Sequence, residues 1–245
     1  MMLLNCDMGE SFGNYTIGAD SAVMPFVDLA NIACGMHASD PEVMDATVAL
    51  AVRHNVLVGA HPGYPDMQGF GRREMALSPV EVRNLVRYQV GALSAFCMTH
   101  GTEVSYIKPH GALYHAMMAH PDILESLLDV ARQYEAKLML LATSGWQRHK
   151  QCADRHGVEL LLEGFVDRGY EDDGSLVHRT KSGALLGEQE MLDRVRGLCA
   201  GTPIVSIHGK TLSFPIDTLC VHGDGKGVPL VKAFRDLIDN KGQQQ

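Results

Sequence analysis

The chain has 245 residues, of which 46% are hydrophobic, so it can bury the core of one barrel or of two smaller domains. Its formal net charge of -8 leaves no basic surplus for phosphates, which argues against a nucleic-acid partner. No apolar run reaches the roughly 18 residues that a membrane span requires.

The N-terminus and the cysteines both favour a cytoplasmic protein. Residues 1–7 lack the basic start and the cleavable apolar stretch of a signal peptide. The six cysteines are scattered without a CxxC pair, which favours reduced thiols over a disulfide framework or a zinc ribbon. No linker, internal repeat or shift in composition divides the chain, so we expect a single domain over residues 1–245.

Short apolar runs alternate with helical patterns along the chain. The predicted strands lie at about 2–6, 27–33, 55–60, 103–108, 137–142, 159–164 and 217–222. The predicted helices cover about 41–54, 79–96, 123–134, 145–156, 187–201 and 231–238. Two hairpins are expected, at 172–175 and at 205–214 with His208-Gly209 at its tip. This alternation predicts an α/β fold with a parallel sheet, and the count of about seven strands indicates an irregular seven-stranded (β/α) barrel, either closed or incomplete.

Polar, titratable residues follow most of the predicted strands. On a parallel barrel the carboxyl ends of the strands meet at one rim, so these side chains should share one site. Imidazoles and carboxylates gathered there can hold a metal or move protons. The residues concerned are Asp7, Glu10, His37, His61, Lys108, His110, Tyr114, Asp167, Arg168, His222 and Asp224.

The strongest of these patterns is Lys108 with His110 and Tyr114. A partly desolvated lysine at a strand end can hold an anion or lose its proton, whereas the simpler alternative is a solvated lysine beside a capping histidine. His61 lies in a loop stiffened by Pro62, which suits one fixed pose, although a plain rigid turn has the same sequence.

Alternation along the first strand should direct Cys6 into the core and Asp7 to the rim, unless Asp7 only caps a turn. Of the adjacent Arg72 and Arg73, one can take a carboxylate or a phosphate in a bidentate fork, and the other is expected to be structural.

Simpler alternatives also remain for the other rim residues. Asp167 and Arg168 can form a local ion pair, and His37 can be a satisfied loop histidine. The glycine-rich turn around His222 and Asp224 can accept an anion or be an ordinary tight turn.

The sequence contains neither a phosphate-binding loop of the Walker type nor a serine nucleophile elbow. Gly209-Lys210-Thr211 resembles the end of a phosphate-binding loop, but the glycine required five places earlier is Ile204. No Gly-x-Ser-x-Gly nucleophile elbow is present either.

Taken together, seven motifs in order resemble the 5-oxoprolinase A-subunit family, also called the lactam-utilisation family, over residues 3 to about 235. Ser39 replaces a usual glycine, and Gly225-Lys226-Gly227 replaces a usual Thr-Pro-containing stretch. The motifs are Leu4-Asn5-Cys6-Asp7-Met8-Gly9-Glu10-Ser11-Phe12-Gly13, Ala30-Asn31-Ile32-Ala33-Cys34-Gly35-Met36-His37-Ala38-Ser39-Asp40-Pro41, Gly59-Ala60-His61-Pro62-Gly63-Tyr64-Pro65-Asp66, Gly69-Phe70-Gly71-Arg72-Arg73, Lys108-Pro109-His110-Gly111-Ala112-Leu113-Tyr114, Phe165-Val166-Asp167-Arg168-Gly169-Tyr170 and Cys220-Val221-His222-Gly223-Asp224.

The resemblance implies ATP-dependent opening of 5-oxoproline to L-glutamate, with ATP as co-substrate and two partner subunits in the complex. It also implies a barrel-like fold related to glycoside hydrolases and carbohydrate deacetylases. In the deacetylases a divalent metal is held by an aspartate and two histidines, and the corresponding positions here are Asp7, His61 and His110. The oligomeric state stays open, a homo-oligomer included.

Three functions follow from these observations. In the first, Asp7, His61, Lys108 and His110 carry out lactam hydrolysis, and the partner subunits share the ATP step because this chain lacks a phosphate loop. The second is a stand-alone metal-dependent amidohydrolase or carbohydrate deacetylase that needs no ATP. The third is a non-catalytic subunit that binds a small carboxylate.

Overall fold

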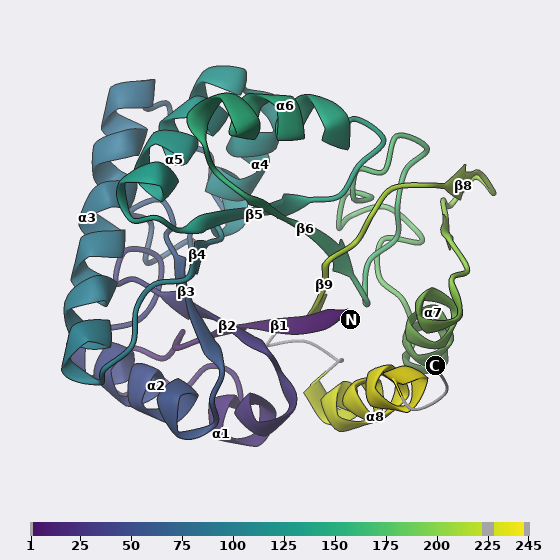
Figure 1. Cartoon of the computed structure of the whole chain (residues 1–245), viewed down its shortest axis with the longest axis horizontal. Coiled ribbons are helices and arrows are strands. Elements are labelled where there is room, and N and C mark those ends of the chain that lie inside the picture. The colour runs from purple at the N-terminus through teal and green to yellow at the C-terminus, as the bar shows by residue number, and fades with distance from the viewer. Residues whose placement is uncertain (1, 222–227, 243–245) are drawn as a thin grey trace.

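Seven parallel strands close into a barrel in the computed structural model, which describes residues 2–221 and 228–242 (Figure 1). The order around the barrel follows the chain, and β1 closes the ring by pairing with β9. The strands are β1 (Leu3–Met8), β2 (Leu29–Ala33), β3 (Leu57–His61), β4 (Tyr106–Ile107), β5 (Lys137–Leu141), β6 (Leu160–Phe165) and β9 (Thr218–Val221). The fold prediction is confirmed, and so are all seven strands.

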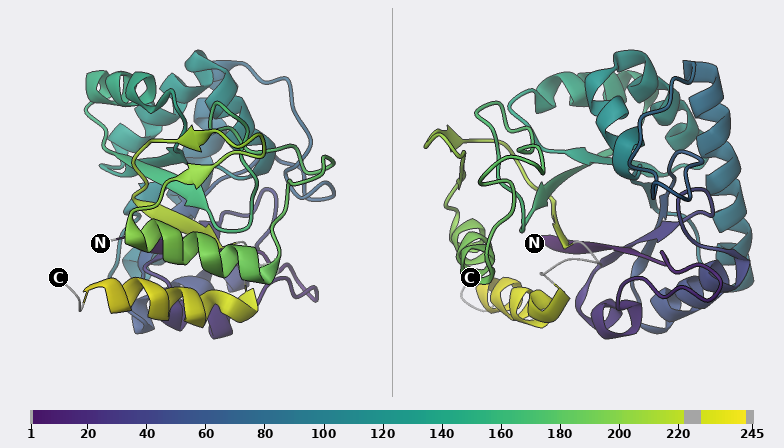
Figure 2. Two further views of the ribbon diagram at one scale, coloured as in Figure 1. Left: turned by 90° about the vertical axis from the view of Figure 1, so that its right-hand side faces the viewer. Right: turned by 180° about the vertical axis from the view of Figure 1, so that it is seen from behind.

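Helices surround this barrel on its outer side (Figures 1 and 2). They are α1 (Asp20–Val23), α2 (Pro41–Arg53), α3 (Pro79–Thr99), α4 (Gly111–Ala119), α5 (Pro121–Gln133), α6 (Trp146–His156), α7 (Glu188–Ala200) and α8 (Val231–Gly242), with short 3-10 turns at Met24–Phe26 and Val228–Leu230. None of the described helices is long and apolar enough to cross a bilayer. Helix α4 was not among the predicted helices, because its mostly apolar residues show no clear helical periodicity.

The predicted capping residues begin the helices as expected. The Asp40 side chain accepts from Val43 N at the start of α2, and Ser78 and Glu81 form a capping box at the start of α3. The hairpin at 205–214 is also present, as β7 (Ile204–Val205) paired antiparallel with β8 (Thr211–Leu212).

The interior of the barrel changes from apolar to polar along the strands. At the amino-terminal end, Leu29, Tyr106 and Met139 form a small apolar cluster of their own. The Tyr106 ring crosses the barrel over Gly59, where a Cβ atom would lie 2.1 Å from the ring, so only glycine fits. Successive strand residues point to opposite faces, and the inward positions further along are polar. The carboxyl ends of the strands therefore surround a polar interior.

Candidate active site

Amide side chains form the base of the polar interior. Asn5 Nδ2 donates to Thr218 Oγ1 over 3.0 Å, and Asn31 Nδ2 donates to Asn5 Oδ1 over 2.8 Å. The Tyr106 hydroxyl completes the layer by donating to Asn31 Oδ1 over 2.7 Å. All four residues are buried. Because these groups satisfy one another, they provide a fixed platform below the titratable side chains.

Lys108 lies above this platform as a buried cation between two carboxylates. Its Nζ is 2.9 Å from Asp7 Oδ1 and 2.7 Å from Glu163 Oε1, and it also lies 3.2 Å from Cys220 Sγ. Burial alone would lower the pKa of Lys108, but Asp7, Cys220 and Glu163 raise it well above its usual value. Lys108 is therefore a fixed ammonium and not a neutral base. Its Asp7 partner also accepts from Asn31 Nδ2 over 2.6 Å.

Two carbonyl oxygens fix the proton positions of His61 and His110. His61 Nδ1 lies 2.7 Å from Lys108 O, and His110 Nε2 lies 2.8 Å from Phe70 O. A carbonyl can only accept, so each of these nitrogens carries a proton. The remaining nitrogens, His61 Nε2 and His110 Nδ1, face each other at 2.9 Å. Two neutral rings would thus point their lone pairs at each other, so this point attracts a proton or another cation.

His37 and Glu10 extend the histidine pair into a cluster of four. The His37 ring stacks on His110 with centroids 3.8 Å apart, and Glu10 Oε1 lies 3.6 Å from both His37 Nε2 and His110 Nδ1. One ligand atom from each of Glu10, His37, His61 and His110 lies within 4.8 Å of the others. Neither His37 nitrogen has a hydrogen-bond partner among the described residues.

Burial favours the neutral forms of His37 and His110. It lowers the pKa of His110 to about 3, with His61 adding to the effect, and it lowers that of His37 well below the usual value. Neutral imidazole is the form that binds metal ions. The cluster therefore has the donors of a transition-metal site, with Asp7 Oδ2 3.5 Å from His61 Nε2 at its edge.

A cavity of about 460 Å³ opens from this cluster to the surface. Phe70, Tyr114, Phe165, Leu176 and Val177 contribute to its walls. Charged and titratable side chains line the remainder, and those outside the floor are Arg72, Glu74, His115, Arg168, His178 and Arg179. An aromatic and aliphatic wall with cations around it suits a small, partly apolar anion.

The two adjacent arginines diverge as the sequence predicted. Arg73 forms a salt bridge with Asp66, which lowers the pKa of that carboxyl to about 2. Arg72 instead lines the cavity, with its guanidinium 5.0 Å from the centre of the Phe70 ring. Arg73 therefore fixes the loop, and Arg72 remains beside the cavity.

The segment after β6 supports the cavity from one side. Arg168 donates from Nε to Ala184 O over 3.2 Å and from Nη2 to Val177 O over 2.7 Å. Its guanidinium thus holds the segment that carries His178 and Arg179, while Asp167 lies half-buried beside it. The Tyr114 hydroxyl donates to Glu163 Oε2 over 2.9 Å, and burial followed by Glu163 raises the pKa of Tyr114 well above its usual value.

The structure gathers most of the predicted rim residues into one site. Asp7 and His61 belong to β1 and β3 and do not follow them, since both strands extend slightly further than expected. Cys6 packs in the hydrophobic core while Asp7 faces the site, as alternation predicted. His222 and Asp224 lie outside the described residues.

The site also contains side chains that the sequence analysis did not select. Asn5 and Asn31 are fully buried polar residues on β1 and β2. Each faces the barrel interior, and Asn5 lies two residues before Asp7 on the same strand face. A polar residue at an inward position of a predicted barrel strand was the pattern that could have identified them.

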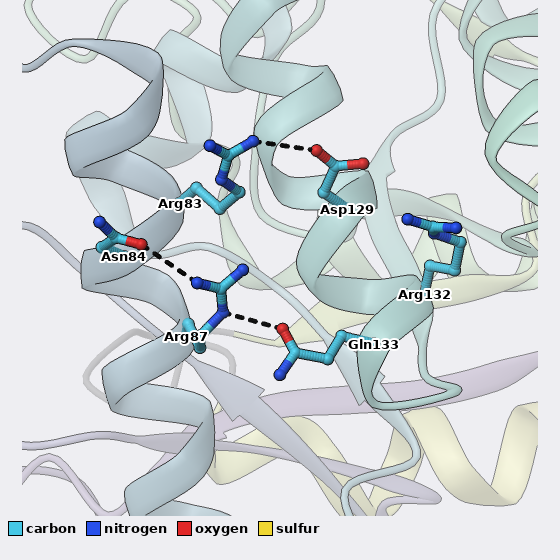
Figure 3. Close-up of a pocket in the computed structure, with 6 residues that line it drawn as sticks. All are labelled: Arg83, Asn84, Arg87, Asp129, Arg132 and Gln133. Atoms are coloured by element: carbon cyan, nitrogen blue, oxygen red, sulfur yellow. Dashed lines mark hydrogen bonds and ion pairs between the residues drawn. The ribbon is translucent and has the colours of Figure 1, made fainter.

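A second hollow lies on the outer surface between α3 and α5 (Figure 3). Its side chains bind mainly each other: Arg83 Nη1 lies 3.2 Å from Asp129 Oδ2, and Arg87 Nε donates to Gln133 Oε1 over 2.8 Å. It shares no lining residue with the cavity at the barrel mouth and contains none of the clustered histidines, so that cavity is the better candidate for chemistry.

A parallel barrel with buried acid–base groups at the carboxyl ends of its strands defines the chain as a barrel enzyme. Comparison with known proteins narrows this class. The chain belongs to the LamB/YcsF family, whose sequence model matches residues 2–245.

Named relatives and solved structures agree with this assignment. The chain is 49% identical to the 5-oxoprolinase A subunit of Chromohalobacter salexigens, over 99% of this chain and 98% of that protein. It is 48% identical to the Vibrio cholerae protein of the same name, over 96% and 97% of the two chains. The lactam utilization protein from Thermus thermophilus shares 35% identity and a TM-score of 0.86, with 99% and 96% of the chains covered.

A more distant structure shares the fold alone. A putative cellobiose-phosphate cleavage protein from Enterococcus faecalis V583 superposes with a TM-score of 0.57 at 12% identity, covering 98% of this chain and 94% of that one.

Proposed function

We propose that this chain hydrolyses the lactam ring of 5-oxo-L-proline to L-glutamate, as one component of an ATP-hydrolysing 5-oxoprolinase. The names of its relatives, which include the word subunit, support a complex with partner chains. The observation that carries the proposal is the buried Lys108 ammonium between Asp7 and Glu163, beside the facing nitrogens of His61 and His110. A cation next to a proton acceptor is what amide hydrolysis requires.

The cavity suits this substrate in size and polarity. The apolar ring carbons pack against Phe70 and Phe165, and the substrate carboxylate pairs with Arg72 at the cavity wall. Arg168 positions the segment that closes the other side. This arrangement directs the lactam carbonyl toward Lys108.

The floor residues then carry out hydrolysis. A water oxygen bonds to the ring carbonyl carbon, and its proton passes to the facing nitrogens of His61 and His110. Asp7, 3.5 Å from His61 Nε2, stabilises the positive charge that results. Lys108 stabilises the negative charge that develops on the carbonyl oxygen. The C–N bond breaks, and the histidine pair returns the proton to the departing ring nitrogen, which yields glutamate.

The same four-residue cluster also fits a divalent ion of the zinc type. Three imidazoles and one carboxylate, Glu10, are suitable ligands, and one His37 nitrogen, which has no hydrogen-bond partner among the described residues, would bond to the ion. Such an ion would polarise the lactam carbonyl as a Lewis acid. Asp7 would then accept the proton of the attacking water. Metal analysis of the purified chain, repeated on a His37→Ala variant, tests this: loss of one equivalent supports the site, and an unchanged content contradicts it.

ATP coupling is expected to depend on the partner subunits, because this chain lacks a phosphate-binding loop of the usual type. The test is release of glutamate from 5-oxoproline and ATP, with and without the partner subunits. We expect turnover only in the complex, with loss of turnover when His110→Ala replaces the native chain. Full coupled turnover by this chain alone would refute the division of labour.

The histidine cluster specifically favours a second candidate, a stand-alone metal-dependent amidohydrolase or deacetylase. That enzyme would hydrolyse its amide without ATP and would lose activity on treatment with a chelator. ATP-independent, chelator-sensitive glutamate release would favour it over the first proposal.

A further inference from the structure

Three side chains of types that can bind a metal lie together between α5 and α6, from the buried Cys152 to the exposed Glu125. These helices pack side by side above β5 in Figure 1. Cys152 and His156 come from α6 and Glu125 from α5, and one ligand atom of each lies within 4.8 Å of the other two. The group is on the helical layer and shares no residue with the site at the barrel mouth.

Helical spacing explains why these residues converge. Cys152 and His156 are four positions apart, so they lie one above the other on the same face of α6. Glu125 and Asp129 have the same spacing on α5. Two such pairs on neighbouring helices face each other, and Asp129 Oδ1 lies 3.3 Å from His156 Nδ1. Three potential ligands therefore meet between the helices, and Asp129 lies beside His156.

The combination of donors selects zinc among the common metal ions. Sulfur, imidazole nitrogen and carboxylate oxygen are its usual ligands, whereas magnesium and calcium prefer oxygen alone. Tetrahedral zinc with bonds of about 2.0–2.3 Å separates its ligand atoms by roughly 3.4–3.8 Å. In this group the ligand atoms lie within 4.8 Å of one another, so at most a small side-chain rotation is needed. Cys152 is buried and fixed at 7% exposure, but Glu125 is exposed and can rotate.

Asp129 adds the support that zinc-binding histidines usually have. Its Oδ1 faces His156 Nδ1, and its Oδ2 is held by Arg83 at 3.2 Å. A carboxylate beside the imidazole fixes the ring orientation and makes the other nitrogen a better ligand.

We propose that Glu125, Cys152 and His156 bind a zinc ion that cross-links α5 and α6, with Asp129 beside them. On binding, the Cys152 thiol releases its proton and the thiolate sulfur bonds to the ion. The link would stabilise α6, which connects β5 to β6, the strand that carries Glu163 of the active site. The proposal does not depend on the reaction at the barrel mouth.

Cobalt(II) provides a test that distinguishes this site from the histidine cluster. Cobalt bound to a thiolate gives a charge-transfer band in the near ultraviolet, and the described cluster at the barrel mouth contains no cysteine. We expect the band in the native chain and its loss in Cys152→Ser. The matched control is Cys97→Ser, since Cys97 is a buried helical cysteine whose thiol pKa burial raises to about 11.

A second variant keeps the test valid if Cys152→Ser does not fold. Glu125 is exposed, so Glu125→Gln should fold normally, yet weaken zinc binding at least about tenfold. Zinc should correspondingly raise the melting temperature of the native chain and of Cys97→Ser more than that of Glu125→Gln. A native chain without the band, a band that survives in Cys152→Ser, or equal zinc affinity in Glu125→Gln would overturn the proposal.

Discussion

Removing the Lys108 ammonium is the most direct test of the buried charge network. Lys108→Met keeps much of the side-chain volume but leaves Asp7 and Glu163 without their shared cation. Glu163 is fully buried, and the Asp7 side chain is only 11% exposed. Breaking a buried ion pair by removing one partner costs about 3–5 kcal/mol. For a chain of this length that lowers the melting temperature by about 10 °C.

A second substitution should recover part of this loss. In Lys108→Met/Glu163→Gln only the Asp7 charge remains, and Asn31 still donates to it. We expect the double variant to be more stable than Lys108→Met by about 1–3 kcal/mol, measured by urea unfolding. Activity should be absent from both, because the developing oxyanion has lost its cation.

The pH dependence of Lys108→Met has a definite sign. Without the ammonium the two buried carboxyls have no cation between them, and burial favours the protonated form of a carboxyl. The folded state then binds more protons, so the deficit relative to the native chain should be larger at pH 8 than at pH 5. A Lys108→Met variant as stable as the native chain, or strict additivity with Glu163→Gln, would refute the charge network.

Three further predictions concern the loops and the histidines. Arg72→Ala should raise KM for 5-oxoproline in the complex about tenfold or more, because Arg72 lines the cavity. Arg73→Ala should mainly lower the melting temperature, because Arg73 pairs with Asp66. Equal effects of the two substitutions on KM would contradict these separate roles. Gly71→Ala should reduce both the free energy of unfolding and kcat, because Gly71 has φ of +64° and a Cβ atom there would lie 2.8 Å from His37 Cβ. A fully active variant would show that this loop does not hold the histidines in place. In metal-free protein the pKa of His110 is about 3, so between roughly pH 6.5 and 3 the unfolded state binds more protons than the folded state. The free energy of unfolding should therefore decrease as the pH is lowered through this window, and it should decrease less steeply in His110→Gln.

The sequence was sufficient to predict the barrel and most of the rim because both depend on local patterns. Apolar runs mark the strands, and the residues after them must meet once the sheet closes. What the patterns could not show is which side chains pair across the barrel. Lys108 contacts Asp7 and Glu163, at sequence separations that only the closed sheet brings together. The sequence therefore left open whether Lys108 holds an anion or loses its proton, whereas in the structure it is an ammonium fixed between two carboxylates.

Ser39, which stands where the family motif usually has a glycine, has a backbone conformation that its sequence did not reveal. The residue has φ of 76°, in the left-handed region that glycine adopts without strain, and it is buried beside the Asp40 helix cap. The backbone strain of a serine there is about 1–2 kcal/mol, partly offset because glycine gains more freedom in the unfolded chain. We expect Ser39→Gly to raise the free energy of unfolding by about 0.5 kcal/mol, measured by urea denaturation, with unchanged kcat in the complex. A clear loss of stability would mean that the Ser39 hydroxyl, 3.4 Å from Asp40 O, contributes more than the strain costs. His37 lies two residues away, so a changed kcat would instead show that this turn sets the position of the histidine cluster.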